Sequence, residues 1–170
     1  MNTKVILARS TWESKNAMTI TSYAEEKDQL IVDTVFIKFF QKITNSQYIS
    51  MQISLFDLRI LINIINQVIG VVKIIQEKNK LNKSNNKEIL PLEYTSSDNI
   101  ITNKSTNKNE QKTITIAFVK STLYINCFYK DNKISLGFKK IEIEPLLASL
   151  LFFVEESTKN FYLQLNRVKK

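Results

Sequence analysis

Apolar and polar residues alternate along the first third of the chain, and this period of two predicts β-strands. Ala17 to Ala24 and Leu30 to Ile43 are predicted to form a hairpin joined by the charged turn EEKDQ. Tyr48 to Ser54 alternates in the same way, and Lys4 to Ser10 is a short apolar run ahead of the hairpin. The first third is therefore predicted to contain four strands.

A long helix is predicted directly after the fourth strand. Ser54 followed by Asp57 is typical of an N-cap with an acidic first turn. From Leu55 to about Lys78 the polar residues recur at steps of three and four, at Arg59, Asn63, Asn66, Gln67, Gly70, Lys73 and Glu77. The rest of the circumference is apolar, which is more than a helix on one sheet needs. We therefore expect two covers, of which one is a second helix of this chain or a second copy of the protein.

Residues 79–111 have a different composition, dominated by Asn, Lys, Ser and Thr. Because this segment has little apolar surface to bury, it is predicted to be a flexible linker. Glu88 to Tyr94 is a candidate strand within it, and Pro91 would suit a sheet edge. The linker separates a first half, residues 1–78, from a second half, residues 112–170.

The second half repeats the order of the first. Its alternating segments, predicted as strands, are Thr113 to Lys120, Thr122 to Lys130 and Lys133 to Ile143. Asp131 and Asn132 suit a tight hairpin turn. Pro145 is predicted at the first position of a helix, which continues with helical spacing from Leu146 to Glu156. A last strand-like segment runs from Phe161 to Val168.

This order predicts an α+β fold made of two pseudo-repeats of ββββα in one integrated domain. Two antiparallel, curved sheets would then enclose two helices that pack together, which explains why the first helix is apolar on so many sides. The alternative is an ordinary α+β domain with two strand-rich halves.

The segment TVFIKFFQK, residues 34–42, has an unusual outer face. Val35, Ile37 and Phe39 suit a core, whereas the opposite face interleaves aromatic rings with lysines. Rings can stack on exposed bases and lysines can neutralise phosphates, so this face suits a single-stranded nucleic acid.

The second half shows a similar pattern on the strand from Thr122 to Lys130. The candidate binding residues are Trp12, Lys15, Phe36, Lys38, Phe40, Lys42, Tyr124, Phe128, Lys130, Lys133, Lys139 and Lys140. Trp12 is predicted to lie in a polar turn between the first two strands.

The net charge also favours an anionic partner. The 170 residues carry 24 basic and 16 acidic side chains, a net charge of +8. Counterion release then favours binding to nucleic acid. The alternative is a solvated surface enriched in Lys by an AT-rich genome. The chain has no His, which excludes His-dependent catalysis. Its two Gly are too few for a glycine-rich phosphate loop, and its single Cys is too few for a thiolate-rich metal site. We therefore expect no enzymatic activity, no cofactor, no metal and no small-molecule substrate.

No membrane segment is expected. The most apolar stretch, Leu55 to Ile75, is interrupted by charged and amide side chains that would be costly in lipid. The N-terminus lacks the apolar segment of a secretory signal. We therefore expect a soluble, intracellular protein, located in the cytoplasm or nucleoid.

The order of sheet then helix, twice over, resembles the Whirly and Pur-alpha group of single-stranded nucleic-acid-binding proteins, which includes the positive-cofactor-four type. The resemblance covers nearly the whole chain outside the linker and is carried by element order. It implies binding of single-stranded DNA or RNA on the outer sheet faces, largely without sequence specificity. It also implies a homodimer or higher homo-oligomer through the helix Leu55 to Lys78. The alternative function is a protein–protein interaction or assembly module with no role in nucleic-acid binding.

Overall fold

The structure is a computed structural model that describes residues 4–27, 30–42, 47–102 and 111–168. The first sheet is antiparallel, with the order β1-β2-β3-β4. Its strands are β1 (Lys4–Glu13), β2 (Asn16–Lys27), β3 (Leu30–Gln41) and β4 (Tyr48–Ile53). The four predicted strands are confirmed. Glu25 to Lys27, predicted as part of the turn EEKDQ, instead continue β2, and the rest of that turn, residues 28–29, lies outside the described residues.

Helix α1 (Leu55–Ser84) begins where the sequence predicted. The Ser54 hydroxyl accepts a hydrogen bond from the Asp57 backbone N–H at 3.0 Å, and the Asp57 carboxylate accepts one from the Ser54 N–H at 2.8 Å. This capping box satisfies two donors at the point where the chain leaves β4. The helix continues past Lys78 to Ser84, into the segment predicted as a linker.

The second sheet is also antiparallel and has one broken edge strand. Its strands are β5 (Glu93–Thr95), β6 (Ile100–Thr102), β7 (Lys112–Val119), β8 (Thr122–Tyr129) and β9 (Asn132–Lys139). Both β5 and β6 pair with β7, so together they occupy the place of one first strand. The candidate strand Glu88 to Tyr94 overlaps β5 only in its last two residues. The segment 79–111 thus includes helix and strand, and its residues 103–110 lie outside the described residues.

Helix α2 (Lys140–Val168) closes the chain and corrects the prediction for this region. It begins directly after β9, so residues 140–143 are helical rather than part of a strand. Pro145 lies in the second turn instead of at the first position. The predicted strand Phe161 to Val168 is wrong, because these residues continue the helix. Buried side chains at Leu146, Leu150, Phe153, Val154 and Ser157 follow a helical period through its first half.

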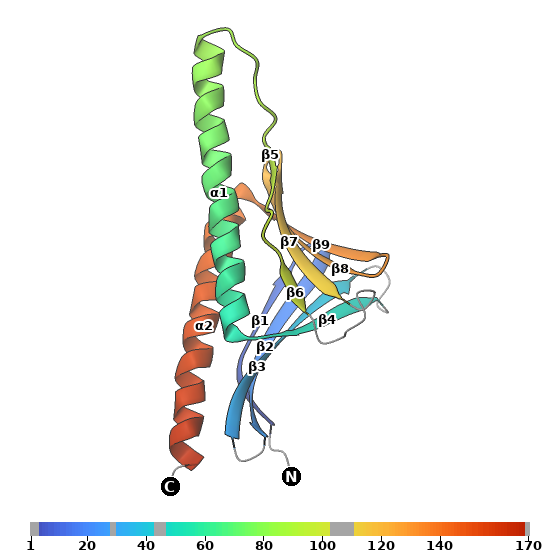
Figure 1. Cartoon of the computed structure of the whole chain (residues 1–170), viewed down its shortest axis with the longest axis vertical. Helices are drawn as coiled ribbons and strands as arrows, with labels where there is room; N and C mark the ends of the chain where they lie inside the picture. Colours follow the sequence, from blue (N-terminus) through green and yellow to red (C-terminus); the bar gives the residue numbers. More distant parts are fainter. Residues whose placement is uncertain (1–3, 28–29, 43–46, 103–110, 169–170) are drawn as a thin grey trace.

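The two helices lie side by side on one side of both sheets (Figure 1). Helix α1 contacts β3, β5, β6 and β7, whereas α2 contacts β1, β2, β8 and β9, so each helix packs on both sheets. The predicted α+β fold with two repeats and two packed helices is confirmed. By length and composition α1 alone among the described helices could cross a membrane. One stripe of its apolar residues, however, is buried in the core, so α1 is a core helix. The buried residues are Leu58, Leu61, Ile62, Ile64, Ile65, Val68 and Val72.

Candidate nucleic-acid interface

Strand β3 separates core and surface residues as its alternation predicted. Val35, Ile37 and Phe39 are fully buried on the side that faces the helices. On the opposite side Phe36 and Phe40 are half-buried, and Lys38 is exposed. The outer face of the first sheet therefore carries aromatic and basic side chains in alternation.

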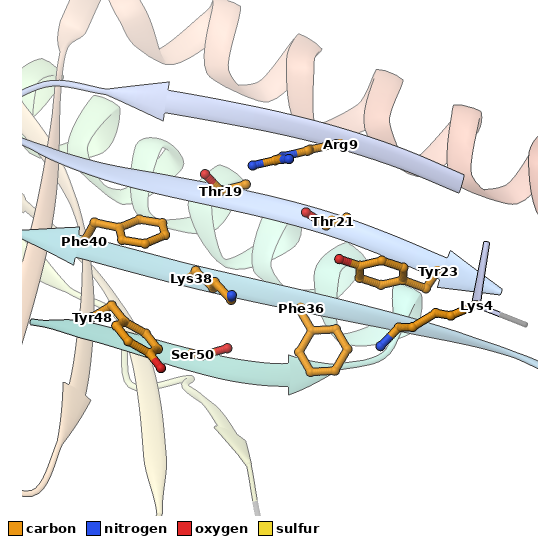
Figure 2. Close-up of a pocket in the computed structure, with 10 residues that line it drawn as sticks. All are labelled: Lys4, Arg9, Thr19, Thr21, Tyr23, Phe36, Lys38, Phe40, Tyr48 and Ser50. Atoms are coloured by element: carbon orange, nitrogen blue, oxygen red, sulfur yellow. The ribbon is translucent and has the colours of Figure 1, made fainter. Parts of the chain in front are cut away.

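Neighbouring strands extend this face into an open groove of about 500 Å³ (Figure 2). Side chains from all four strands line it: Lys4, Arg9, Thr19, Thr21, Tyr23, Phe36, Lys38, Phe40, Tyr48 and Ser50. We call this surface the groove. Threonine and serine hydroxyls lie between the aromatic and basic groups, so the surface of the groove offers hydrogen-bond partners as well as rings and cations.

Two aromatic pairs mark the two ends of the groove (Figure 2). The rings of Tyr23 and Phe36 meet edge to face with centroids 5.8 Å apart. The rings of Phe40 and Tyr48, which are paired across β3 and β4, have centroids 6.3 Å apart. Phe36 and Phe40 are four residues apart in one strand, so at about 3.3 Å per residue the two pairs are separated by about 13 Å.

Three cations line the groove with these rings. The Lys4 ammonium lies 4.3 Å from the centroid of the Tyr23 ring and 4.6 Å from that of Phe36. The Lys38 ammonium lies 5.8 Å from the centroid of Tyr48, a cation–π distance. Arg9 is exposed beside β2. Each end of the groove therefore combines a ring pair with a positive charge.

A β-bulge is required to place two of these cations together. Lys4 and Arg9 are five residues apart, and residues five apart in a regular strand point to opposite faces. The register of β1 against β2 shifts at Leu7, which adds one residue and brings both side chains to the groove. The Asn160 amide of α2 donates a hydrogen bond to the Leu7 carbonyl oxygen at 2.7 Å. Helix α2 therefore supports the bulge from behind the sheet.

The second sheet carries a smaller version of this face. Tyr124 and Phe128 are half-buried on the outer side of β8, and the Lys133 ammonium lies 5.4 Å from the Phe128 ring centroid. Asn126 lies between them, with Oδ1 accepting a hydrogen bond from the Ser135 hydroxyl at 2.7 Å. Phe128 and Lys133 are direct cross-strand neighbours in the register of β8 and β9. The aromatic and basic pattern predicted in the second half is therefore present at Phe128 and Lys133.

Several predicted site residues have other environments. Trp12 lies within β1 rather than in a turn, and it is half-buried against the core. The Lys42 ammonium forms an exposed ion pair with Glu13 at 2.9 Å. Lys130, with φ of 53°, lies in the β8–β9 turn, which comes one residue earlier than the predicted Asp131-Asn132 turn.

The remaining predicted lysines surround a different part of the surface. Lys15 is exposed in the turn between β1 and β2. Lys139 ends β9, and Lys140 begins α2 instead of lying on a strand. None of these three residues lines the groove.

Seven groove residues were missed by the sequence analysis: Lys4, Arg9, Thr19, Thr21, Tyr23, Tyr48 and Ser50. Alternation from Thr19 through Thr21 to Tyr23 does indicate that these residues share a face. It does not indicate which face of β3 they adjoin, because that depends on the register between strands.

The single cysteine does not take part in this surface. Cys127 is buried on the core side of β8, with its sulfur 3.5 Å from the sulfur of Met51. Burial raises the pKa of the thiol to about 12, and the nearby positive charge of Lys112 offsets only part of this effect. Among the described residues no group of three or more Asp, Glu, Cys or His side chains could hold a metal ion.

Comparison with known proteins supports the fold and not a family membership. No protein-family model matches the chain, and no curated protein matches it. The structure is similar to that of WHY1 from Arabidopsis thaliana, with 11% identity, coverage of 99% of this chain and 90% of that chain, and a TM-score of 0.51. The structure of the plant transcriptional regulator PBF-2 has 12% identity to this chain, coverage of 99% of this chain and 87% of that chain, and a TM-score of 0.48. The chain therefore has a Whirly-like fold, as its order of elements had indicated.

Proposed function

We propose that this protein is a non-enzymatic binder of single-stranded DNA or RNA. The observation that carries the proposal is the groove, where two aromatic pairs and three cations share one sheet face. Unpaired strands expose flat bases and a charged backbone, which rings and cations bind respectively. The Whirly-like fold supports the proposal, but one fold can host many functions, so the side chains of the groove carry more weight than the fold.

The spacing of the ring pairs suits a short run of nucleotides. Stacked nucleotides rise about 3.4 Å each along one strand, so about 13 Å between Phe36 and Phe40 corresponds to about four nucleotides. A base would stack at each end of the groove. Lys4, Arg9 and Lys38 would contact the phosphates, with the hydroxyl of Ser50 as a further donor. Since every base has a π-face, this arrangement binds largely without sequence preference.

Fluorescence anisotropy with labelled oligo(dT) and oligo(U) tests the proposal. We expect Phe36→Leu and Phe40→Leu each to weaken binding by roughly 5- to 150-fold, the range for loss of one stacked base. Phe161→Leu is the matched control, because Phe161 is half-buried on α2, outside the groove. If neither groove variant weakens binding while the wild type binds, the groove is not the interface. If the wild type binds neither oligonucleotide at low salt, the nucleic-acid function is wrong and an assembly module is favoured instead.

We also propose that the protein self-associates through its helices. Both helices expose large apolar side chains: Phe56, Ile74 and Leu81 on α1, and Ile141, Leu151, Phe152, Tyr162 and Leu163 on α2. Monomeric proteins rarely expose so many large apolar groups on neighbouring elements. A second copy presents the same surface, so an isologous dimer would cover it twice. Sedimentation of the wild type and of Phe152→Glu tests this. Monomers for the wild type at micromolar concentration would contradict it.

A role in binding DNA or RNA places the protein inside the cell, in the cytoplasm or nucleoid. Imaging of a fluorescently tagged full-length chain tests this location.

A further inference from the structure

The Tyr124 ring lies over a glycine on the outer face of the second sheet. Gly137 lies opposite Tyr124 in the register of β8 and β9. A Cβ atom at position 137 would lie 3.0 Å from Cε1 and 3.3 Å from Cδ1 of the Tyr124 ring. It would also lie 3.1 Å from Cγ2 of Thr122. Contacts this short are tighter than nine in ten of those that real Cβ atoms make, so a side chain at position 137 requires the ring to move by a few tenths of an ångström. A glycine inside a strand is unfavourable for the strand itself, and it often marks a close approach of another group.

The use of glycine at this position is notable because the chain has only two glycines. The other, Gly70, lies exposed on α1, and a Cβ atom there would have nothing within 4 Å beyond the neighbouring backbone of its own helix. Gly137 is therefore the position in this chain where the absence of a side chain shapes a surface. That surface includes the ring of Tyr124.

Tyr124 and Gly137 line a second concave surface, an open hollow of about 710 Å³ that we call the hollow. The tip of the β1–β2 hairpin and the end of β3 form its other side. Lys15 and Lys139 supply two exposed cations at the hollow. One carboxylate also lines it, that of Glu142, which accepts a hydrogen bond from the Lys139 backbone N–H at 2.6 Å. The hollow thus combines an aromatic ring, cations and polar groups, as the groove does, and adds one carboxylate.

The groove and the hollow meet at the end of β3. Phe40 lines the groove and Gln41 lines the hollow, and consecutive strand residues point to opposite faces. A nucleic-acid strand that leaves the groove at its Phe40–Tyr48 end therefore reaches the hollow by passing around the tip of the first sheet. Lys15 lies at this tip, and Lys42 follows β3 beside it.

We propose that the hollow is a second stacking subsite, in which Tyr124 receives a base of the same single strand that occupies the groove. The inference rests on the proposed function and extends it from one sheet face to a path that links both sheets. Gly137 is the residue that positions the Tyr124 ring for stacking. Lys15 and Lys139 contact the phosphates on either side of the stacked base.

A length series of oligo(dT), from about 4 to about 16 nucleotides, separates the two subsites. The shortest oligonucleotides fill the groove alone, so Tyr124→Leu should bind them as tightly as the wild type does. The longest ones also reach the hollow, so the same variant should bind them on the order of 10-fold more weakly. Tyr124→Phe should restore wild-type binding, since the ring alone stacks. Gly137→Ala should weaken binding of long oligonucleotides by displacing the ring, and Gly70→Ala is its matched control.

An abasic scan tests the same contact without altering the protein fold. Single abasic residues are placed along the longest oligonucleotide, and the wild type should show one sensitive position outside the segment held by the groove. That sensitivity should disappear in Tyr124→Leu, because the base and the ring are partners in one contact. The fluorescence of Trp12, the only tryptophan, checks that each variant is folded.

The possible failures are distinguishable. Equal binding of long oligonucleotides by the wild type, Tyr124→Leu and Gly137→Ala, with no abasic position outside the groove segment, overturns the second subsite. The proposed function then still stands if Phe36→Leu weakens binding of short oligonucleotides. If the wild type binds no oligonucleotide of any length, the proposed function itself has failed.

Discussion

The salt dependence of binding can be worked out from the charges in the groove. Lys4, Arg9 and Lys38 are the cations that line it. Each phosphate contact on a single strand contributes about −0.7 to the slope of log K against log salt concentration, so three contacts predict a slope of about −2.1. Raising the salt concentration fourfold should then weaken binding of a short oligonucleotide by about 18-fold.

Replacing Lys38 by Gln removes one of these contacts while keeping a side chain of similar length. The slope should fall to about −1.4, so the same fourfold rise in salt should weaken binding by about 7-fold. Lys42→Gln should change the slope less, because the Lys42 ammonium is already engaged by Glu13 at 2.9 Å. Lys73→Gln, an exposed lysine on α1, is the control and should leave the slope unchanged.

The assay is fluorescence anisotropy with a labelled oligo(dT) too short to reach the second sheet, repeated at several salt concentrations. Two results would refute the reasoning. A wild-type slope near zero would show that phosphates are not bound by these side chains. Equal slopes for Lys38→Gln, Lys73→Gln and the wild type would show that Lys38 does not contact the backbone.

Three further predictions concern buried or half-buried groups. The hydroxyls of Ser22 and Ser157 are buried 2.7 Å apart between β2 and α2, so Ser157→Ala should lower the free energy of unfolding by about 1–3 kcal/mol. Replacing both serines by alanine should lower it less than Ser157→Ala alone, because no unpaired hydroxyl is then left buried. Equal losses of stability in denaturant titrations would contradict this. Asn160→Ala removes the hydrogen bond to the Leu7 carbonyl and should cost about 1 kcal/mol of stability, whereas an unchanged denaturation midpoint would show that the bulge needs no support from α2. Burial raises the pKa of Cys127 from about 9 to about 12, so between these pH values the folded chain keeps a proton that the unfolded chain loses. The contribution of the thiol to stability is therefore complete below pH 9 and decreases as the pH rises toward 12. Thiol reagents should label the native protein slowly at pH 8, and rapid labelling without unfolding would contradict burial of the thiol.

Local patterns predicted most of the elements because they act over a few residues. The alternation in β3 placed Val35, Ile37 and Phe39 on the core side, and all three are fully buried. The start of α1 was predicted to the residue, because the Ser54–Asp57 capping box is formed within four consecutive residues. Such signals need no knowledge of the rest of the chain.

Local patterns failed where two periods fit the same residues. The segment from Phe161 to Val168 alternates well enough to suggest a strand, yet it continues α2. Eight residues are too few to distinguish a period of two from a period of 3.6 in an amphipathic stretch. The helix is decided by packing of its earlier turns, where Phe153 and Ser157 are buried on one stripe.

For the candidate site, the sequence by itself determined which residues of one strand share a face, because side-chain direction in a strand depends only on position. It therefore identified Phe36, Lys38 and Phe40 as one outer face. Only the tertiary structure decided which side chains of other strands adjoin them. Arg9 reaches the groove through a bulge that exists only relative to the partner strand, and Tyr48 faces Phe40 through the register of β3 and β4. Register and bulges arise from pairing between distant segments, and no single strand contains that information.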